Sequence, residues 1–148
     1  MKIKIRKAEN IDLKAIHDLV MELAIYEKAP EEFTASIEDY VRDFETNWFE
    51  AIVAELNNEV VGMMLFYHTY STWKGRMLYL EDFVVKEAHR RNGVGALLME
   101  ELIKIAQQKK CKLIKWQVLD WNMPAIEFYK KYECKFEAEW LNVKYFIN

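Results

Sequence analysis

The stretch "HRRNGVGALL" (residues 89–98) joins two different kinds of sequence pattern and decides how the chain folds. Before it, "MLYLEDFVV" (77–85) is typical of a β-strand. After the glycines, apolar residues recur at the spacing of one helix face: Val94, Leu97, Leu98, Leu102, Ile105 and Ala106. The stretch therefore predicts a strand that turns sharply into an amphipathic helix.

The turn itself has the composition of an anion-binding site. Gly93 and Gly95 are two of the four glycines in the chain, and they leave the backbone open to close approach. The first turn of a helix carries unpaired N–H groups and a partial positive charge. Arg90 and Arg91 stand where acidic residues would stabilise the helix alone. Together these features predict a phosphate or pyrophosphate site. The alternative is an ordinary glycine turn with two solvated arginines.

Periodicity predicts the remaining elements on both sides of this turn. Strands are expected at 2–6, 48–56, 59–70, 112–120 and 140–147, and helices at 11–27, 36–44 and 123–132. Asn57 and Asn58 are expected to form a hairpin turn, and Ser36 with Asp39 a capping box. Because strands precede, separate and follow the helices, the fold class is α/β. We expect one domain over residues 1–148, with a mixed central sheet flanked by helices.

Composition excludes several classes of protein. Hydrophobic residues make up 52% of the 148 residues and charged residues 30%, which is typical of a folded domain. A net charge of -3 argues against nucleic-acid binding, and no apolar run is long enough for a membrane span. Cys111 and Cys134 lack metal-site spacing, which favours free thiols in the cytoplasm. No cluster of histidines and carboxylates indicates a metal site.

The motif R-x-x-G-x-G at residues 90–95 resembles the acetyl-coenzyme A pyrophosphate loop of the GNAT superfamily of N-acetyltransferases. The order of elements fits that fold along the whole chain. "ELAIYEK" (22–28), "YSTWKGRMLYLEDFVV" (70–85), "LDWNMPAIEFYKK" (119–131) and Trp140 further resemble the spermidine/spermine acetyltransferase family. "YSTWKG" and "VLDWN" (118–122) are closest to its branch that acetylates thialysine. The resemblance implies acetyl-coenzyme A as co-substrate, no metal, a small amine as acceptor and a homodimer.

Acetyl transfer requires that the acceptor amine lose a proton. A lysine-like amine has a pKa of about 10.4, so holding it neutral near pH 7 costs roughly 4 to 5 kcal/mol. Glu81 is the candidate that binds the ammonium and removes this proton, directly or through water, and the resemblance points to the same residue. A structural ion pair is the alternative. Asp82 is expected on the opposite face of the strand, without a shared role.

The departing thiolate must in turn receive a proton. Tyr129 matches the tyrosine that serves as general acid in the family, and a phenol with a pKa near 10 suits this role. The alternative is an ordinary core tyrosine in an apolar helix.

The resemblance also assigns the contacts to the acetyl donor. The backbone of Phe83, Val84 and Val85 is expected to pair with the pantetheine arm, as an added strand would. Asn122 to Ala125 are expected to contact the donor from the far side. The pyrophosphate is expected at Arg90, Arg91, Asn92, Gly93, Val94, Gly95 and Ala96. Position 91 is commonly glycine in this loop.

For the acceptor, Tyr26 and Glu27 match substrate contacts of the family. Two carboxylates, Glu27 and Glu81, suit a substrate that carries two cationic amines. Ser71 replaces an aspartate of the polyamine branch, which weakens attraction for a long polycation and favours thialysine or a short diamine. Three alternatives stay open: a protein-lysine acetyltransferase, an antibiotic-amine acetyltransferase, or a coenzyme A sensor without turnover.

Overall fold

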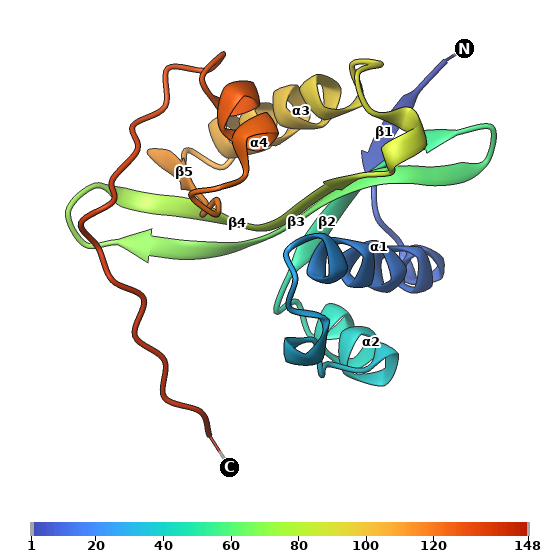
Figure 1. Cartoon of the computed structure of the whole chain (residues 1–148), viewed down its shortest axis with the longest axis horizontal. Coiled ribbons are helices and arrows are strands. Elements are labelled where there is room, and N and C mark those ends of the chain that lie inside the picture. The colour runs from blue at the N-terminus through green and yellow to red at the C-terminus, as the bar shows by residue number, and fades with distance from the viewer. Residues whose placement is uncertain (1, 148) are drawn as a thin grey trace. The chain divides into compact units, whose positions relative to one another are not determined.

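The computed structural model of the protein describes residues 2–147. Its internal contacts divide the chain into two compact units, Met1–Gln117 and Val118–Asn148. In Figure 1 the first unit runs from blue to orange, and the second contains the orange helix and the red C-terminal segment. The single domain expected from the sequence stays a prediction.

The first unit is built on a five-stranded sheet with the strand order β1-β2-β3-β4-β5. All neighbouring strands are antiparallel except β4 and β5, which are parallel, so the sheet is mixed as predicted. Asn57 and Asn58 have φ values of 52° and 64°, the conformation that a tight hairpin turn requires. The strands are β1 Lys4–Lys7, β2 Glu50–Leu56, β3 Glu59–Ser71, β4 Gly75–Val85 and β5 Leu113–Lys115.

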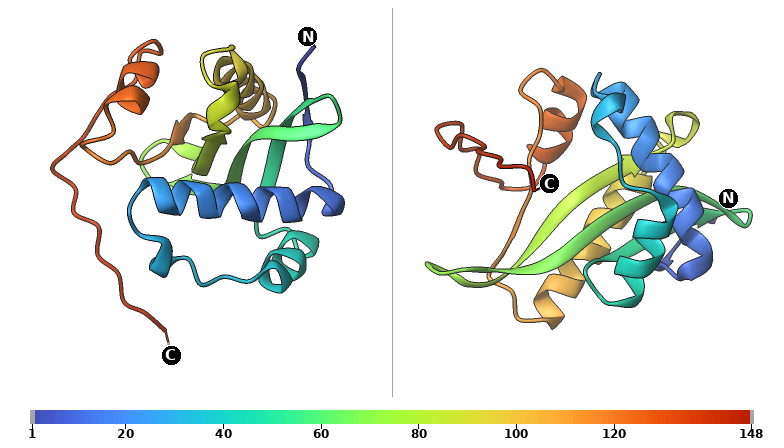
Figure 2. Two further views of the ribbon diagram at one scale, coloured as in Figure 1. Left: turned by 45° about the vertical axis from the view of Figure 1, so that its right-hand side comes forward. Right: turned by 90° about the horizontal axis from the view of Figure 1, so that it is seen from below.

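Helices cover both faces of this sheet, which confirms the predicted α/β class (Figures 1 and 2). The helices α1 Leu13–Tyr26 and α2 Ile37–Glu45 lie on one face, and α3 Val94–Gln108 lies on the other. The core on the α1 side joins that helix to three strands through Leu13, Ile16, Leu19, Ala51, Val53, Met63, Leu65 and Val84. Short 3-10 helices occur at Asn10–Asp12, Pro30–Glu32 and Glu87–His89.

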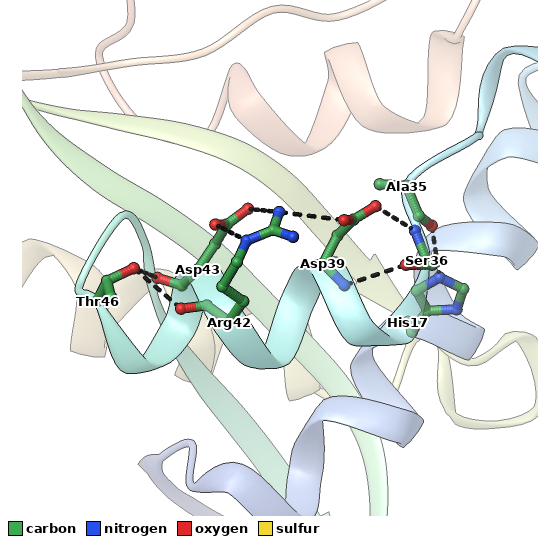
Figure 3. A network of polar contacts seen from close by, with 7 residues as sticks. All are labelled: His17, Ala35, Ser36, Asp39, Arg42, Asp43 and Thr46. Atoms are coloured by element: carbon green, nitrogen blue, oxygen red, sulfur yellow. Dashed lines mark hydrogen bonds and ion pairs between the residues drawn. The ribbon is translucent and has the colours of Figure 1, made fainter.

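The capping box predicted for α2 is confirmed. Ser36 Oγ accepts a hydrogen bond of 3.1 Å from the backbone N–H of Asp39, whose carboxylate accepts one of 2.9 Å from Ser36. Figure 3 shows that the same network continues through Arg42 and back to α1, where His17 Nε2 donates to the Ala35 carbonyl at 2.9 Å. These bonds fix the start of α2 against α1.

Two strand predictions differ from the structure. The strand expected at 112–120 ends at Lys115, and the segment expected as a strand at 140–147 has no regular structure. That segment is apolar but exposed: Val143, for example, is 91% exposed. A strand needs a partner for its N–H and C=O groups, and no strand of residues 2–147 pairs with it. In the second unit, α4 spans Met123–Tyr129, shorter than the predicted 123–132.

Both cysteines, Cys111 and Cys134, are free thiols, as the sequence predicts. None of the helices within residues 2–147 combines the length and the apolar character that crossing a bilayer requires.

Candidate active site

Glu81 lies at a β-bulge in the middle of β4. In the ladder between β3 and β4, Leu65 pairs with Asp82 whereas Phe66 pairs with Leu80, so Glu81 is the extra residue. A bulge of this kind places two residues opposite one and breaks the regular alternation of side chains. The faces occupied by Glu81 and Asp82 therefore cannot be inferred from an uninterrupted strand.

Both carboxylates lie on the α1 side of the sheet. Val84 belongs to the core on that side, and Asp82, two residues earlier on β4, faces the same way. Leu65 belongs to the same core, and Tyr67, two residues later on β3, donates a hydrogen bond of 2.8 Å from its hydroxyl to Glu81 Oε1. The expectation that Glu81 and Asp82 point to opposite faces is wrong, because it assumed regular alternation.

The Asp82 carboxyl lies in a partly buried and negatively charged environment. Its burial, followed by the negative charges of Glu81 and Glu27, raises the pKa of Asp82 to about 7. Burial also raises the pKa of Glu27. On α2, the pKa of Tyr40 is raised by burial and by the charges of Asp82 and Glu81. This partly buried negative field suits a cationic substrate and a group that exchanges a proton near neutral pH.

The end of α1 supplies the predicted acceptor contacts. Tyr26 is the last residue of α1 and Glu27 is its C-cap, and the charge of Glu27 reaches Asp82 on β4. The guanidinium carbon of Arg90 lies 5.9 Å from the centre of the Tyr26 ring, and Arg90 Nε donates a hydrogen bond of 2.9 Å to the Val85 carbonyl. The structure thus places the first arginine of the loop beside the predicted acceptor residues.

Ser71 lies away from these residues within the chain. It pairs with Gly75 at the tip of the β3–β4 hairpin, and its Oγ accepts a hydrogen bond of 3.0 Å from the Lys74 backbone N–H. Along β4, Glu81 is six positions beyond Gly75, which corresponds to about 20 Å of strand. The Ser71 side chain closes the hairpin turn.

The predicted pyrophosphate turn has an open geometry. Gly93 is the N-cap of α3 with φ of 82°, a Cβ added there would meet no atom within 4 Å, and no acidic side chain lies in the first turn. Gly95 and Ala96 lie in that turn. The Val94 side chain is buried in the core, where its Cγ1 lies 3.2 Å from the position that a Cβ on Gly62 would occupy. The backbone of Val94 is therefore the part that a ligand can contact.

Arg91 and Asn92 complete this turn. Arg91 has φ of 66°, a conformation that glycine adopts far more readily. Asn92, with His89, lines a cavity of about 250 Å³. An uncapped helix start preceded by two arginines fits a pyrophosphate group.

The adjacent edge of β4 fits the pantetheine arm. β5 pairs with Met77–Tyr79, and beyond Tyr79 no strand of residues 2–147 continues along this edge of β4, although β4 extends to Val85. An extended arm can therefore add to the edge as a strand would. The open anion turn and the open strand edge together fit the acetyl-coenzyme A that the resemblance implies.

The second unit holds the remaining candidates. Asn122 is the N-cap of α4, and its Oδ1 accepts a hydrogen bond of 3.4 Å from the Ala125 backbone N–H. Tyr129 is the last residue of α4, and its ring meets that of Phe128 edge to face at 5.8 Å. Asn122 thus has a local capping role, and the donor contacts of Asn122 and Ala125 and the catalytic role of Tyr129 stay predictions.

Sequence reasoning missed the contributions of Tyr67 and Asp82. Nothing in the sequence of β3 distinguishes Tyr67 from Tyr70, because the pairing of Tyr67 with Glu81 depends on register across two strands. The one signal for Asp82 is the pair of adjacent acids inside an otherwise apolar strand. Across residues 2–147, no group of three or more histidines, cysteines or carboxylates is arranged to hold a metal ion.

Comparison with known proteins identifies the family to which the chain belongs. Residues 13–133 match the acetyltransferase (GNAT) family. The chain is 38% identical over 138 residues to the thialysine N-epsilon-acetyltransferase of Bos taurus. The aligned region covers 86% of this chain and 81% of that protein. It is 35% identical over 135 residues to the spermidine/spermine N(1)-acetyltransferase-like protein 1 of Homo sapiens, covering 85% of this chain and 19% of that protein.

The fold also matches a solved structure. A crystal structure of an aminoglycoside acetyltransferase from an uncultured soil metagenomic sample superposes with a TM-score of 0.81 at 20% identity, covering 99% of this chain and 97% of that one. The names of the two sequence relatives confirm the resemblance to the spermidine/spermine family and its thialysine branch. The chain is an N-acetyltransferase and belongs to the acetyltransferase (GNAT) family.

Proposed function

We propose that the protein transfers acetyl from acetyl-coenzyme A to a primary amine of a small diamine-like substrate, with thialysine or a short diamine as the favoured acceptor. The observation that carries this proposal is the group of Glu27, Glu81 and Asp82, which share one negative field between the end of α1 and the bulge of β4. Such a field attracts an ammonium group and tolerates a second one. The relatives named for thialysine and for spermidine/spermine support the same class of acceptor.

The reaction is a direct attack of the amine on the thioester within a ternary complex. The acetyl donor supplies the activated carbonyl, with its pyrophosphate at the turn before α3 and its pantetheine along β4. Glu81, oriented by Tyr67, holds the acceptor ammonium at the bulge and takes its proton, directly or through water. Tyr129 gives a proton to the departing thiolate. Tyr26 and Glu27 contact the remainder of the acceptor from the end of α1.

The position of Ser71 supports the preference for a short acceptor. Ser71 lies about 20 Å along the hairpin from Glu81. Among the candidate acceptors, a long polyamine comes nearest to the length needed to reach from Glu81 to Ser71. An aspartate at the hairpin tip would attract the distal amine of a long polycation, and serine removes that charge. Serine in place of aspartate at position 71 therefore does not weaken the binding of a short acceptor at Glu81.

The exposed C-terminal segment supports the expected homodimer. Six apolar residues in the segment are more than two-thirds exposed: Trp140, Leu141, Val143, Tyr145, Phe146 and Ile147. A second copy of the chain would supply a partner for this segment, and burial of these side chains would stabilise the dimer. Sedimentation velocity of the full chain tests this. The two free cysteines support the expected cytoplasmic location.

The experiment that tests the activity identifies the product. The protein is incubated with acetyl-coenzyme A labelled with ¹³C in the acetyl group and with thialysine, and the product is analysed by NMR and mass spectrometry. We expect one acetyl group on the side-chain amine, and a strongly reduced yield with Glu81→Gln. Tight donor binding without acetylation of any small amine would contradict the proposal and favour a sensor or a protein-lysine acetyltransferase.

A further inference from the structure

We infer that Asn92 is a site of spontaneous deamidation, and that its conversion to a carboxylate weakens the binding of acetyl-coenzyme A at the turn before α3. Asn92 is the one asparagine of the chain that a glycine follows. The inference goes beyond the proposed acetyl transfer. Its effect on binding rests on the proposed place of the pyrophosphate at this turn.

Deamidation is an attack of the backbone on the preceding side chain. The nitrogen of Gly93 loses its proton to solvent base and bonds to Cγ of Asn92, and the C–N bond of the side-chain amide breaks as ammonia leaves with a proton from water. Water then opens the five-membered succinimide at one of its two carbonyls. The product is aspartate, or isoaspartate in which the backbone runs through the former side chain. In sum one water is consumed and one ammonia is released, so no oxidant or other reactant is needed.

The attacking nitrogen of Gly93 is available in this structure. Within residues 2–147 its N–H donates no hydrogen bond to another backbone group, although the Gly93 carbonyl accepts one of 3.1 Å from Leu97. A Cβ added at Gly93 would meet no atom within 4 Å, so the space beside the nitrogen is open. A hydrogen bond that holds the N–H, or a bulky residue after the asparagine, would slow the attack. Neither obstacle is present at this turn.

The Asn92 side chain is equally free to be attacked. It is exposed, and in the described part of the chain, residues 2–147, no hydrogen bond holds its amide. Asn92 and His89 line a cavity of about 250 Å³, which gives water access to the amide. Asn122 shows the contrast, since its Oδ1 accepts a hydrogen bond of 3.4 Å from the Ala125 N–H and the residue after it is Met123.

The charges around the turn favour the reaction. Its transition state carries negative charge on the nitrogen of Gly93 and on the side-chain oxygen of Asn92. Arg90 and Arg91 precede this pair, and no acidic side chain lies in the first turn of α3. A positive field of this kind stabilises a developing negative charge. The features that fit the turn to an anion therefore also make its asparagine reactive.

The product opposes the ligand that the turn fits. Either product places a carboxylate directly before the N-cap of α3, where we propose that the pyrophosphate binds. One negative charge about 5 Å from two phosphate charges should raise the dissociation constant of acetyl-coenzyme A by about tenfold, even with the screening of water. Isoaspartate also lengthens the backbone by one atom at this point, which displaces Gly93. Bound coenzyme A should in turn protect Asn92, because the ligand covers the Gly93 N–H.

Peptide mapping by mass spectrometry tests the modification. The full chain is incubated at about pH 8 for several days, and each peptide that contains asparagine is followed for a gain of about 1 Da. We expect the peptide of Asn92 to convert to a mixture of aspartate and isoaspartate. With coenzyme A at about ten times its dissociation constant, the conversion should slow by about tenfold. Conversion of Asn92 no faster than that of Asn47 or Asn142 would overturn the inference.

Calorimetry tests the effect on binding. Asn92→Asp carries the charge of the product and should raise the dissociation constant of acetyl-coenzyme A by about tenfold, and by less at high salt. The matched control is Asn47→Asp, at an exposed asparagine with φ of 64° beyond the end of α2. It adds the same charge and should leave the dissociation constant unchanged.

A third variant tests the chemistry itself. In Asn92→Gln the attack would have to form a six-membered ring, which closes far more slowly than the succinimide. The dissociation constant of this variant should stay at its own starting value throughout the incubation, whereas that of the wild-type protein rises. An equal rise in both proteins would overturn the inference.

The outcomes separate this inference from the proposed function, because neither mass spectrometry nor calorimetry requires turnover. Equal dissociation constants for Asn92→Asp and Asn47→Asp, or no protection of Asn92 by coenzyme A, would overturn the inference even if the fresh protein acetylates thialysine. Absence of thiol release from the fresh protein with every amine would overturn the proposed function, and the mass and binding measurements would still decide the role of Asn92.

Discussion

The hydroxyl of Tyr67 donates a hydrogen bond of 2.8 Å to Oε1 of Glu81, and this bond ties β3 to the one residue of β4 that the ladder leaves unpaired. A bulged residue lacks the pairing that normally fixes its backbone, so a side-chain bond is an efficient way to fix its orientation. Tyr67 also stacks on Tyr79 with ring centres 5.5 Å apart, which holds its own ring in place.

Replacement of Tyr67 by phenylalanine should therefore loosen Glu81 without changing the shape of the site. A hydrogen bond of this kind contributes about 1 kcal/mol, which corresponds to about a fivefold loss in kcat/KM for the amine. The KM for acetyl-coenzyme A should stay the same. The control is Tyr70→Phe on the same strand, where the ring is 66% exposed. Equal kinetics of the two variants would show that the bond does not orient Glu81.

The stability of the protein should depend on Asp82 in a pH-dependent way. Its pKa is raised to about 7 in the folded chain, so the folded chain binds this proton more tightly than the unfolded chain does. Stability from this group is therefore lost as the pH rises from about 4 to about 7. Above that window the cost is on the order of 4 kcal/mol, at about 1.4 kcal/mol for each pH unit between the two pKa values.

Asp82→Asn removes this cost, so we expect the variant to be the more stable protein at pH 8 and nearly equal to wild type at pH 4. Chemical unfolding at both pH values measures the difference. A variant that is less stable than wild type at pH 8 would contradict this electrostatic picture.

The effect of the Arg91 side chain on ligand binding can be separated from the effect of its backbone conformation on stability. Arg91 has φ of 66°, so glycine relieves strain there but adds entropy to the unfolded chain, and the free energy of unfolding should change by less than about 1 kcal/mol. If the guanidinium contacts the pyrophosphate, Arg91→Gly should weaken acetyl-coenzyme A binding about fivefold, and less at high salt.

Lys110 offers a matched control for Arg91. It is a basic residue with φ of 59° just beyond the C-terminal end of α3, far along the helix from the pyrophosphate turn. Lys110→Gly should change stability by a similar amount and leave the dissociation constant of acetyl-coenzyme A unchanged. Equal calorimetric dissociation constants for both variants would show that the Arg91 side chain points to solvent.

Tyr129→Phe tests the proposed general acid. Without the phenol the thiolate must leave unprotonated, so kcat should fall by about 100-fold while the dissociation constant of acetyl-coenzyme A stays the same. Stopped-flow thiol release and calorimetry measure the two quantities. Tyr132→Phe, three positions further along the chain, is the control. A loss in kcat below about threefold for Tyr129→Phe would assign this tyrosine to packing.

The features that the sequence predicts correctly depend on residues close together in the chain. The capping box needs Ser36 and Asp39, the hairpin turn needs Asn57 and Asn58, and the sharp turn into α3 needs the glycines after Arg90 and Arg91. Each of these signals reflects backbone geometry within a few residues. The order of elements follows from the same local patterns, which is why the α/β class is predictable.

The features that the sequence does not reveal depend on pairing between distant segments. The bulge at Glu81 exists because Leu65 and Phe66 on β3 pair with Asp82 and Leu80. No local pattern distinguishes such a register from a regular one. The electrostatic interaction between Glu27, at the end of α1, and Asp82 on β4 links residues more than 50 positions apart in the sequence. The segment 140–147 has a strand-like pattern, but a pattern cannot supply the partner that a strand requires.

The measurement that tests the central claim most directly is thiol release from acetyl-coenzyme A with thialysine, lysine, putrescine, spermidine and spermine under identical conditions. The account predicts turnover with these small amines, with kcat/KM for thialysine well above that for spermine. The negative field at Glu81 binds a short substrate that carries two ammonium groups, and Ser71 provides no charge for the distal amine of a long one. Higher kcat/KM for spermine would contradict the role given to Ser71. No thiol release with any of the five amines, despite binding of acetyl-coenzyme A, would contradict the proposed function.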